Sequence, residues 1–137
     1  MKPFRVLVVD DEPDFLETLV KRLNKRRVDA TGTDSGRKAL ELLENESFDV
    51  VILDVRMPGL DGIETLREIK RKRPFMEVIM LTGHGSVESG MQGMQLGAFD
   101  YVLKPAEIDD LLERVQQAYQ RKTLHESRVQ TQMDIDK

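Results

Sequence analysis

Acidic, hydroxyl and basic side chains end the apolar runs of this sequence. An Asp pair follows the first run, and single polar residues end or follow three later runs; the five residues are Asp10, Asp11, Asp54, Thr82 and Lys104. Carboxylates that lie side by side repel one another, and a cluster of them is costly without a cation. Their oxygen ligands suit Mg²⁺, which also stabilises the charge that develops during phosphoryl transfer. These residue types therefore indicate a magnesium-dependent phosphoryl site.

Within this set, Asp54 is the candidate nucleophile, because a carboxylate can form an aspartyl phosphate. Thr82 could donate a hydrogen bond to one phosphoryl oxygen, and the Lys104 ammonium could pair with another. Taken alone, each residue is common in turns or at helix caps. The chemistry therefore depends on whether the predicted elements bring all five together.

Two patterns alternate along the chain between residues 4 and 119. Apolar runs rich in Val and Ile, which are typical of strands covered on both faces, lie at residues 4–9, 28–33, 49–54, 77–81 and 99–103. Stripes with helical spacing follow these runs and begin at Phe15, Ala39, Ile63, Val87 and Ile108. Met91 and Met94 belong to the fourth stripe, and we interpret them as core packing.

This alternation predicts an α/β protein with a parallel sheet and right-handed crossovers. Five units are too few for a closed barrel of eight, so we expect a (βα)5 doubly wound open sheet, flavodoxin-like, with strand order 2-1-3-4-5. In that order, the carboxyl ends of the first and third strands meet at the centre. Residues 1–120 are predicted to form one domain. Residues 121–137 are polar, and their sequence fits a helix extension, a linker or a disordered tail.

The composition excludes several kinds of site. The chain has 137 residues and no cysteine, which rules out disulfides and a thiolate nucleophile; its two histidines, His84 and His125, are far apart. The net charge of −4 argues against direct nucleic-acid binding by this chain. No apolar run is long enough to cross a bilayer, and the N-terminus lacks the cleavage site of a signal peptide. We therefore expect a cytoplasmic protein without a membrane segment.

The motifs together resemble the receiver domain of two-component response regulators. The resemblance runs from about Arg5 to Tyr119 and includes "VLVVDDEP", "FDVVILDVRMPGLDG", "VIMLTGHG" and "GAFDYVLKP". It implies that Asp54 accepts a phosphoryl group from a sensor histidine kinase or a phosphotransfer protein. It also implies a set of Mg²⁺ ligands: Asp10, Asp11, Asp54 and the backbone carbonyl of Arg56.

The resemblance further implies a switch. Thr82 moves toward the phosphoryl group and Tyr101 turns inward, which remodels the face formed by the fourth helix, the fifth strand and the fifth helix. The Lys104–Pro105 peptide is expected to be cis, and Arg56 and His84 are expected to tune the lifetime of the phosphoryl group. The remodelled face would control a downstream protein or output domain, and a homodimer through it is one arrangement that the sequence leaves open.

The expected role is regulatory rather than enzymatic, with the domain contributing to its own phosphotransfer and autodephosphorylation. One alternative is a receiver or scaffold that signals without phosphorylation. Another is a small haloacid-dehalogenase-like phosphatase, but that class has an Asp-x-Asp nucleophile motif after its first strand, where this chain has Asp10, Asp11 and Glu12. A flavin-binding domain would need a phosphate-binding loop at the same place, and these carboxylates would repel a phosphate.

Overall fold

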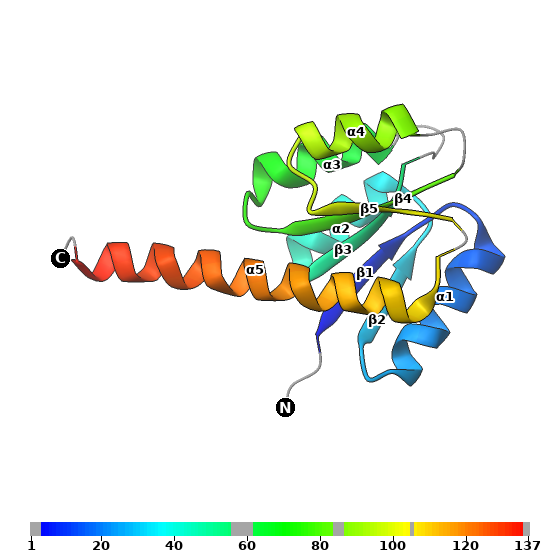
Figure 1. Ribbon diagram of the computed structural model, residues 1–137, viewed down its shortest axis with the longest axis horizontal. Coiled ribbons are helices and arrows are strands. Elements are labelled where there is room, and N and C mark those ends of the chain that lie inside the picture. The colour runs from blue at the N-terminus through cyan, green and yellow to red at the C-terminus, as the bar shows by residue number, and fades with distance from the viewer. Residues whose placement is uncertain (1–3, 56–61, 84–86, 105, 136–137) are drawn as a thin grey trace.

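The computed structural model describes residues 4–55, 62–83, 87–104 and 106–135. Within these ranges, strands and helices alternate along the chain (Figure 1). The elements are β1 (Arg5–Val9), α1 (Pro13–Lys25), β2 (Asp29–Thr33), α2 (Gly36–Asn45), β3 (Val50–Asp54), α3 (Gly62–Lys72), β4 (Glu77–Thr82), α4 (Val87–Gln95), β5 (Asp100–Leu103) and α5 (Ile108–Ile135).

All strand pairs are parallel, and the order β2-β1-β3-β4-β5 confirms the predicted fold class. The register determines which residues meet at the carboxyl edge. Val9 of β1 lies opposite Leu53 of β3, so that Asp10 and Asp54 follow at the same level. The pairing of β4 with β5 ends at Thr82, which is therefore at this edge as well.

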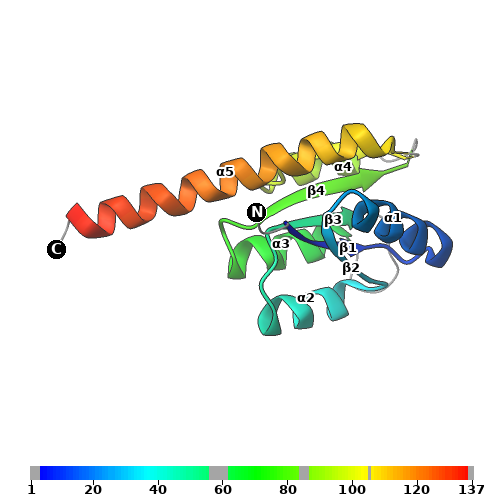
Figure 2. The same cartoon turned by 90° about the horizontal axis from the view of Figure 1, so that it is seen from below.

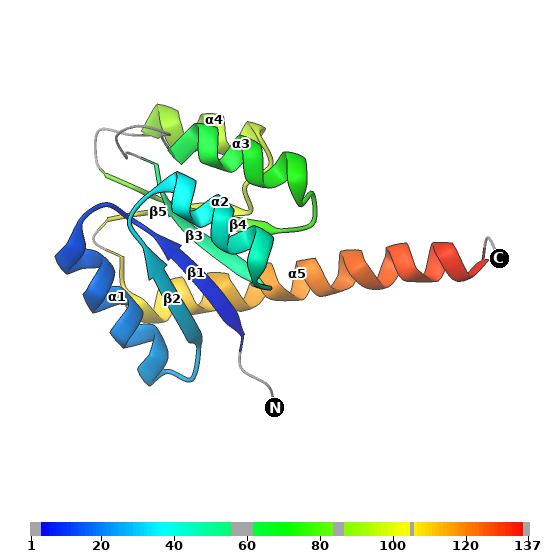
Figure 3. The same ribbon diagram turned by 180° about the vertical axis from the view of Figure 1, so that it is seen from behind.

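Helices cover both faces of the sheet. Alternate residues of each strand point to opposite faces, so each strand contributes to two cores. One core lies under α1 and α5 and includes Val6, Val8, Ile52, Ile79, Leu111 and Val115. The other lies under α2, α3 and α4 and includes Leu7, Val9, Leu53, Leu66, Ile69 and Met80. Thus α5 crosses the near side of the sheet in Figure 1, whereas α2 lies on the near side in Figure 3.

The prediction that Met91 and Met94 of α4 pack in the core is wrong. Met91 is 58 % exposed and Met94 is 39 % exposed. Gly93 is the buried residue of this stretch, and a Cβ atom there would overlap the sulfur of Met80 in β4. The helix approaches the sheet through a residue without a side chain, and this close approach leaves the two methionines on the surface.

Helix α5 is longer than its buried stripe. Leu111, Val115 and Ala118 are buried, and the centroid of the Tyr119 ring lies 4.3 Å from that of the Phe4 ring. The helix continues to Ile135. Figures 1, 2 and 3 all show this distal part projecting beyond the sheet. None of the helices in the described ranges combines the length and apolar character needed to span a bilayer.

Candidate functional site

Four of the side chains expected to do chemistry meet at the carboxyl edge of the sheet. Asp10, Asp54 and Thr82 are buried there. The Lys104 ammonium lies 2.8 Å from Asp10 Oδ2 and 3.6 Å from Asp54 Oδ2. It also lies 3.0 Å from Oε1 of Glu12, whose side chain is 64 % exposed. The site is therefore a group of three carboxylates around one ammonium, beside a buried hydroxyl.

Backbone hydrogen bonds fix these positions. The Asp10 N–H donates to the Thr33 carbonyl at 3.1 Å, which extends the β1–β2 ladder by one residue. The Glu12 N–H donates to Asp10 Oδ1 at 2.9 Å, as in an Asx turn. The Lys104 N–H donates to the Thr82 carbonyl at 2.8 Å. This bond extends the β4–β5 ladder by one residue beyond the end of β5. Asp10 and Lys104 therefore directly follow a strand, and Asp54 and Thr82 are the last residues of theirs.

Gly62, the first residue of α3, lies against the end of β3. Its N–H donates to the Val55 carbonyl at 3.2 Å. A Cβ atom on Gly62 would lie 2.5 Å from the Val55 Cα and would overlap the carbonyl oxygen of Asp54. Because these neighbours are backbone atoms, they cannot rotate away as a side chain could. The absence of a side chain at Gly62 therefore lets α3 start beside Asp54 without displacing it.

The charge balance of the site is visible at Lys104. Burial alone would lower the pKa of its ammonium, but hydrogen bonds to Asp10 and Glu12 and the charges of Asp10 and Asp54 outweigh it, so the pKa is raised. The ammonium also lies 4.4 Å from the centroid of the Phe15 ring, on the α1 side of the site. Lys104 is accordingly a permanent cation at neutral pH that offsets part of the acidic charge.

One buried oxygen of the site, Thr82 Oγ1, has no hydrogen-bond partner within the described residues. A second, Asp10 Oδ2, is contacted among these residues by the Lys104 ammonium alone. A buried polar atom without a hydrogen bond costs about 1–3 kcal/mol. The carboxylate oxygen suits a cation, and the hydroxyl suits a hydrogen-bond acceptor.

Three carboxylates at this edge are close enough to share a cation, and the expected role of Asp11 as a ligand remains a prediction. Oxygens of Asp10, Glu12 and Asp54 lie within 4.8 Å of one another. Asp11 is not in this group; it lines a groove between α1 and β2 together with Leu16 and other residues. Sequence reasoning noted Glu12 in the acidic run but assigned it no role. Hard oxygen donors in this number fit Mg²⁺, with solvent completing the coordination.

The remaining predicted residues divide into two groups. Tyr101 of β5 is half-buried, lies opposite Met80 in the sheet and packs against the core under α2, α3 and α4. Arg56, His84 and Pro105 lie outside the described residues. Their expected roles in metal binding, phosphoryl lifetime and the cis peptide remain predictions.

The face around β5 is apolar in part. Leu103 of β5 is exposed, as are Met91 and Met94 of α4. On its other side, Arg114 of α5 forms an ion pair with Asp100 of β5. The surface from α4 across β5 to α5 therefore combines exposed apolar side chains with charged ones.

Comparison with known proteins agrees with this geometry. Residues 6–116 match the family model described as the response regulator receiver domain. The transcriptional regulatory protein GlrR of Escherichia coli K12 is 36 % identical over 120 residues, which are 88 % of this chain and 27 % of that protein. The chain spans about a quarter of the length of the curated relatives it matches.

Solved structures give the same assignment. A response regulator receiver domain protein from Clostridium thermocellum superposes with a TM-score of 0.84 at 39 % identity, covering 88 % of this chain and 98 % of that one. NtrX from Brucella abortus gives a TM-score of 0.87 at 28 % identity, covering 94 % of this chain and 29 % of that one. With the family model matching most of its length and the acidic site in place, this chain belongs to the response regulator receiver domain family.

Proposed function

We propose that this receiver accepts a phosphoryl group on Asp54 in a Mg²⁺-dependent reaction. The observation that carries the proposal is the buried Asp54 carboxylate, which lies 3.6 Å from the Lys104 ammonium that also contacts Asp10. The Thr82 hydroxyl at the same edge has no hydrogen-bond partner among the described residues. The proposed donor is a phosphohistidine of a sensor kinase or phosphotransfer protein, and the proposed location is the cytoplasm. The role is regulatory, because the phosphoryl group stays on the protein instead of being passed to a small substrate.

The carboxylates provide the metal site in this proposal. Asp10 and Asp54 would hold Mg²⁺, with Glu12 or Asp11 and the backbone carbonyl of Arg56 completing the protein ligands. When bound, the ion neutralises the carboxylates and stabilises the charge that develops on the transferring group. The support from the structure is the set of three carboxylates whose oxygens lie within 4.8 Å of one another, together with the full burial of Asp10.

The chain's own groups perform the transfer. One Asp54 oxygen attacks the phosphorus of the phosphohistidine, and the P–N bond breaks with its electron pair remaining on the imidazole nitrogen, which takes up a proton. Lys104 pairs with one phosphoryl oxygen, and the Thr82 hydroxyl donates to another. For autodephosphorylation, a water oxygen attacks the same phosphorus, the bond to Asp54 breaks, and inorganic phosphate leaves the restored carboxylate.

The proposed output is a change at the surface of α4, β5 and α5. A hydrogen bond from Thr82 to the phosphoryl group would draw this residue toward Asp54, and the half-buried Tyr101 would turn into the space left behind. The exposed Met91, Met94 and Leu103 would then change their arrangement. Partners of this surface would be a downstream protein, an output domain or a second copy of the chain. Residues 1–120 would form the receiver, and residues 121–137 its C-terminal extension.

Intact-mass spectrometry after incubation with Mg²⁺ and acetyl phosphate tests the proposal. We expect one added phosphoryl group on the wild type and on Asp14→Asn, which replaces an exposed carboxylate in the first turn of α1. We expect none on Asp54→Asn or when the metal is chelated. Phosphorylation of Asp54→Asn to the wild-type extent would contradict the assigned acceptor. No addition from acetyl phosphate or from a phosphorylated kinase would favour a receiver that signals without phosphorylation.

A further inference from the structure

Glu77 is a buried carboxylate that the proposed phosphoryl chemistry does not use. It is the first residue of β4, at the opposite end of this strand from Thr82, and it is 1 % exposed. Arg121 of α5 donates to its Oε2, and Lys70 of α3 lies 3.8 Å from its Oε1. Buried carboxylates occur almost only in such pairs, because an unpaired one is strongly destabilising. Glu77 therefore binds α5 and α3 to the start of β4.

Arg121 makes a second contact at the same place. Its guanidinium lies 4.6 Å from the centroid of the Phe99 ring, and Phe99 directly precedes β5. The planar guanidinium suits both contacts, since its edge donates to a carboxylate while its face stacks on a ring. One α5 side chain thus contacts the beginnings of β4 and β5, the strands that lead to Thr82 and Lys104.

Beyond Arg121, none of the described residues of α5 is fully buried. Its last buried residue is Ala118. Ion pairs and hydrogen bonds such as Lys122–Glu126 and Gln130–Asp134 run along the distal helix itself rather than to the sheet. His125 of the distal helix makes a ring contact with Phe75 in the connection before β4, with the ring centroids 5.9 Å apart. A polar helix of this length is only marginally stable without tertiary contacts.

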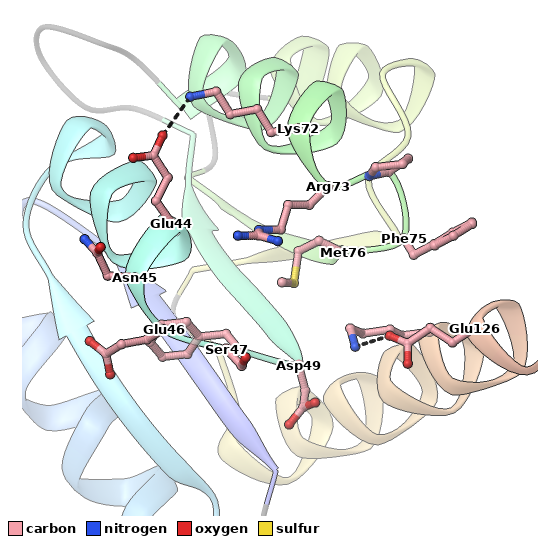
Figure 4. A pocket seen from close by; sticks show the side chains of 13 residues that line it. Glu44, Asn45, Glu46, Ser47, Asp49, Lys72, Arg73, Phe75, Met76 and Glu126 are labelled. Carbon is pink, nitrogen blue, oxygen red and sulfur yellow. Dashed lines mark hydrogen bonds and ion pairs between the residues drawn. The ribbon is translucent and has the colours of Figure 1, made fainter. Parts of the chain in front are cut away.

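A cleft lies between the start of the distal helix and the body of the protein. It has a volume of about 470 Å³ and lies between α5 and the connections that precede β3 and β4. Figure 4 shows Glu126 of α5 on one side and Ser47, Asp49 and Phe75 across the opening. Lys122 and Glu126 of the distal helix therefore line one side of the cleft and face the connections before β3 and β4 across it.

We propose that Glu77 and Arg121 form a clasp that fixes the direction of distal α5, residues 122–135, relative to the sheet. A relative movement of β4 and β5 would change both contacts of Arg121 at once and so redirect the distal helix. The use of this device in signalling rests on the proposed function, because it is the phosphoryl switch that would move the strands. The clasp itself exists without phosphorylation and can be tested alone.

The absence of cysteine makes the test direct. Spin labels on Glu41→Cys in α2 and Ser127→Cys in distal α5 give a distance distribution by double electron–electron resonance, measured without a phosphodonor. We expect a narrow distribution in the parent and about a twofold or greater broadening in Arg121→Gln and Glu77→Gln, because a helix without tertiary contacts frays. Arg121→Lys, which keeps the charge but not the planar group, should be intermediate.

Arg114→Gln is the matched control. Arg114 is also an α5 arginine with an ion pair, to Asp100, but it lies before the point where the helix leaves the sheet. It should leave the distribution narrow. Urea unfolding of every variant separates loss of the clasp from loss of the fold, and Arg121 is exposed enough for its variant to fold even if Glu77→Gln does not. Unchanged widths in folded Arg121→Gln, or equal broadening in Arg114→Gln, would overturn the clasp; neither result depends on whether Asp54 is phosphorylated.

Discussion

Replacing Lys104 with methionine removes the cation that the three carboxylates share. The contact with the fully buried Asp10 is 2.8 Å long, and breaking a buried pair of this kind costs about 3–5 kcal/mol. The contact with Glu12, which is 64 % exposed, adds at most about 1 kcal/mol. Without divalent cations, the free energy of unfolding of Lys104→Met should therefore lie about 3–5 kcal/mol below that of the wild type, the buried contact setting the value.

Magnesium should reduce this difference if the carboxylates bind it as proposed. A ligand that binds only the folded state at a hundred times its Kd stabilises that state by about 2.7 kcal/mol. In the wild type, bound Mg²⁺ must displace Lys104 from at least part of its contacts, and this competition lowers the gain. In Lys104→Met there is no ammonium to displace. Magnesium should therefore stabilise the variant more than the wild type.

Urea unfolding of both proteins with and without Mg²⁺ measures these four free energies. Lys122→Met is the matched control. The Lys122 side chain is 17 % exposed, close to the 16 % of Lys104, but the ion pair described for it is with Glu126, which is exposed. Its loss should cost less than about 1 kcal/mol and should not depend on magnesium. A cost below about 1 kcal/mol for Lys104→Met, or an equal effect of Mg²⁺ on variant and wild type, would refute this account of the site.

Two further predictions concern the same edge of the sheet. Gly62→Ala should destabilise the fold by about 1–3 kcal/mol and slow phosphorylation of Asp54, because the new Cβ meets backbone atoms of Asp54 and Val55 that must move. Urea unfolding measures the stability, and a time course of phosphorylation measures the rate. Wild-type values in both would contradict the close packing of Gly62 against these residues. The raised pKa of Lys104 means that its stabilisation is fully present below the pKa of an unfolded lysine, about 10.4, and is lost as the pH rises through the higher folded value. The difference in unfolding free energy between wild type and Lys104→Met should therefore shrink above about pH 10.4, and a difference that stays constant there would show that the ammonium is not stabilised by its neighbours.

The fold was predictable because its signals are local and repeated. Val- and Ile-rich runs alternating with helical stripes leave few topologies for a chain of this length, and the polar residues that end the runs fall at one edge in the predicted strand order. For this reason Asp10, Asp54, Thr82 and Lys104 meet as expected. The hydrogen bonds that position them are consequences of the same strand pairing.

What the sequence did not reveal depends on distances between elements. The spacing of Met91 and Met94 fits a buried stripe, but spacing alone does not show how close a helix lies to its sheet, and Gly93 determines that distance. Likewise, the sequence places Asp11 and Glu12 side by side, and only the turn after β1 decides which of the two carboxylates reaches Lys104. The pairing of Glu77 with Arg121 links residues 44 positions apart and has no local signal.

The close approach of Gly93 to Met80 separates the folding of α4 from its surface chemistry. The contact with the sheet uses the backbone of the helix, whereas Met91 and Met94 point to solvent and contribute little to the core. Substitutions at such exposed positions usually change stability by less than about 0.5 kcal/mol. The outer surface of α4 can therefore change at these two positions with little effect on the fold.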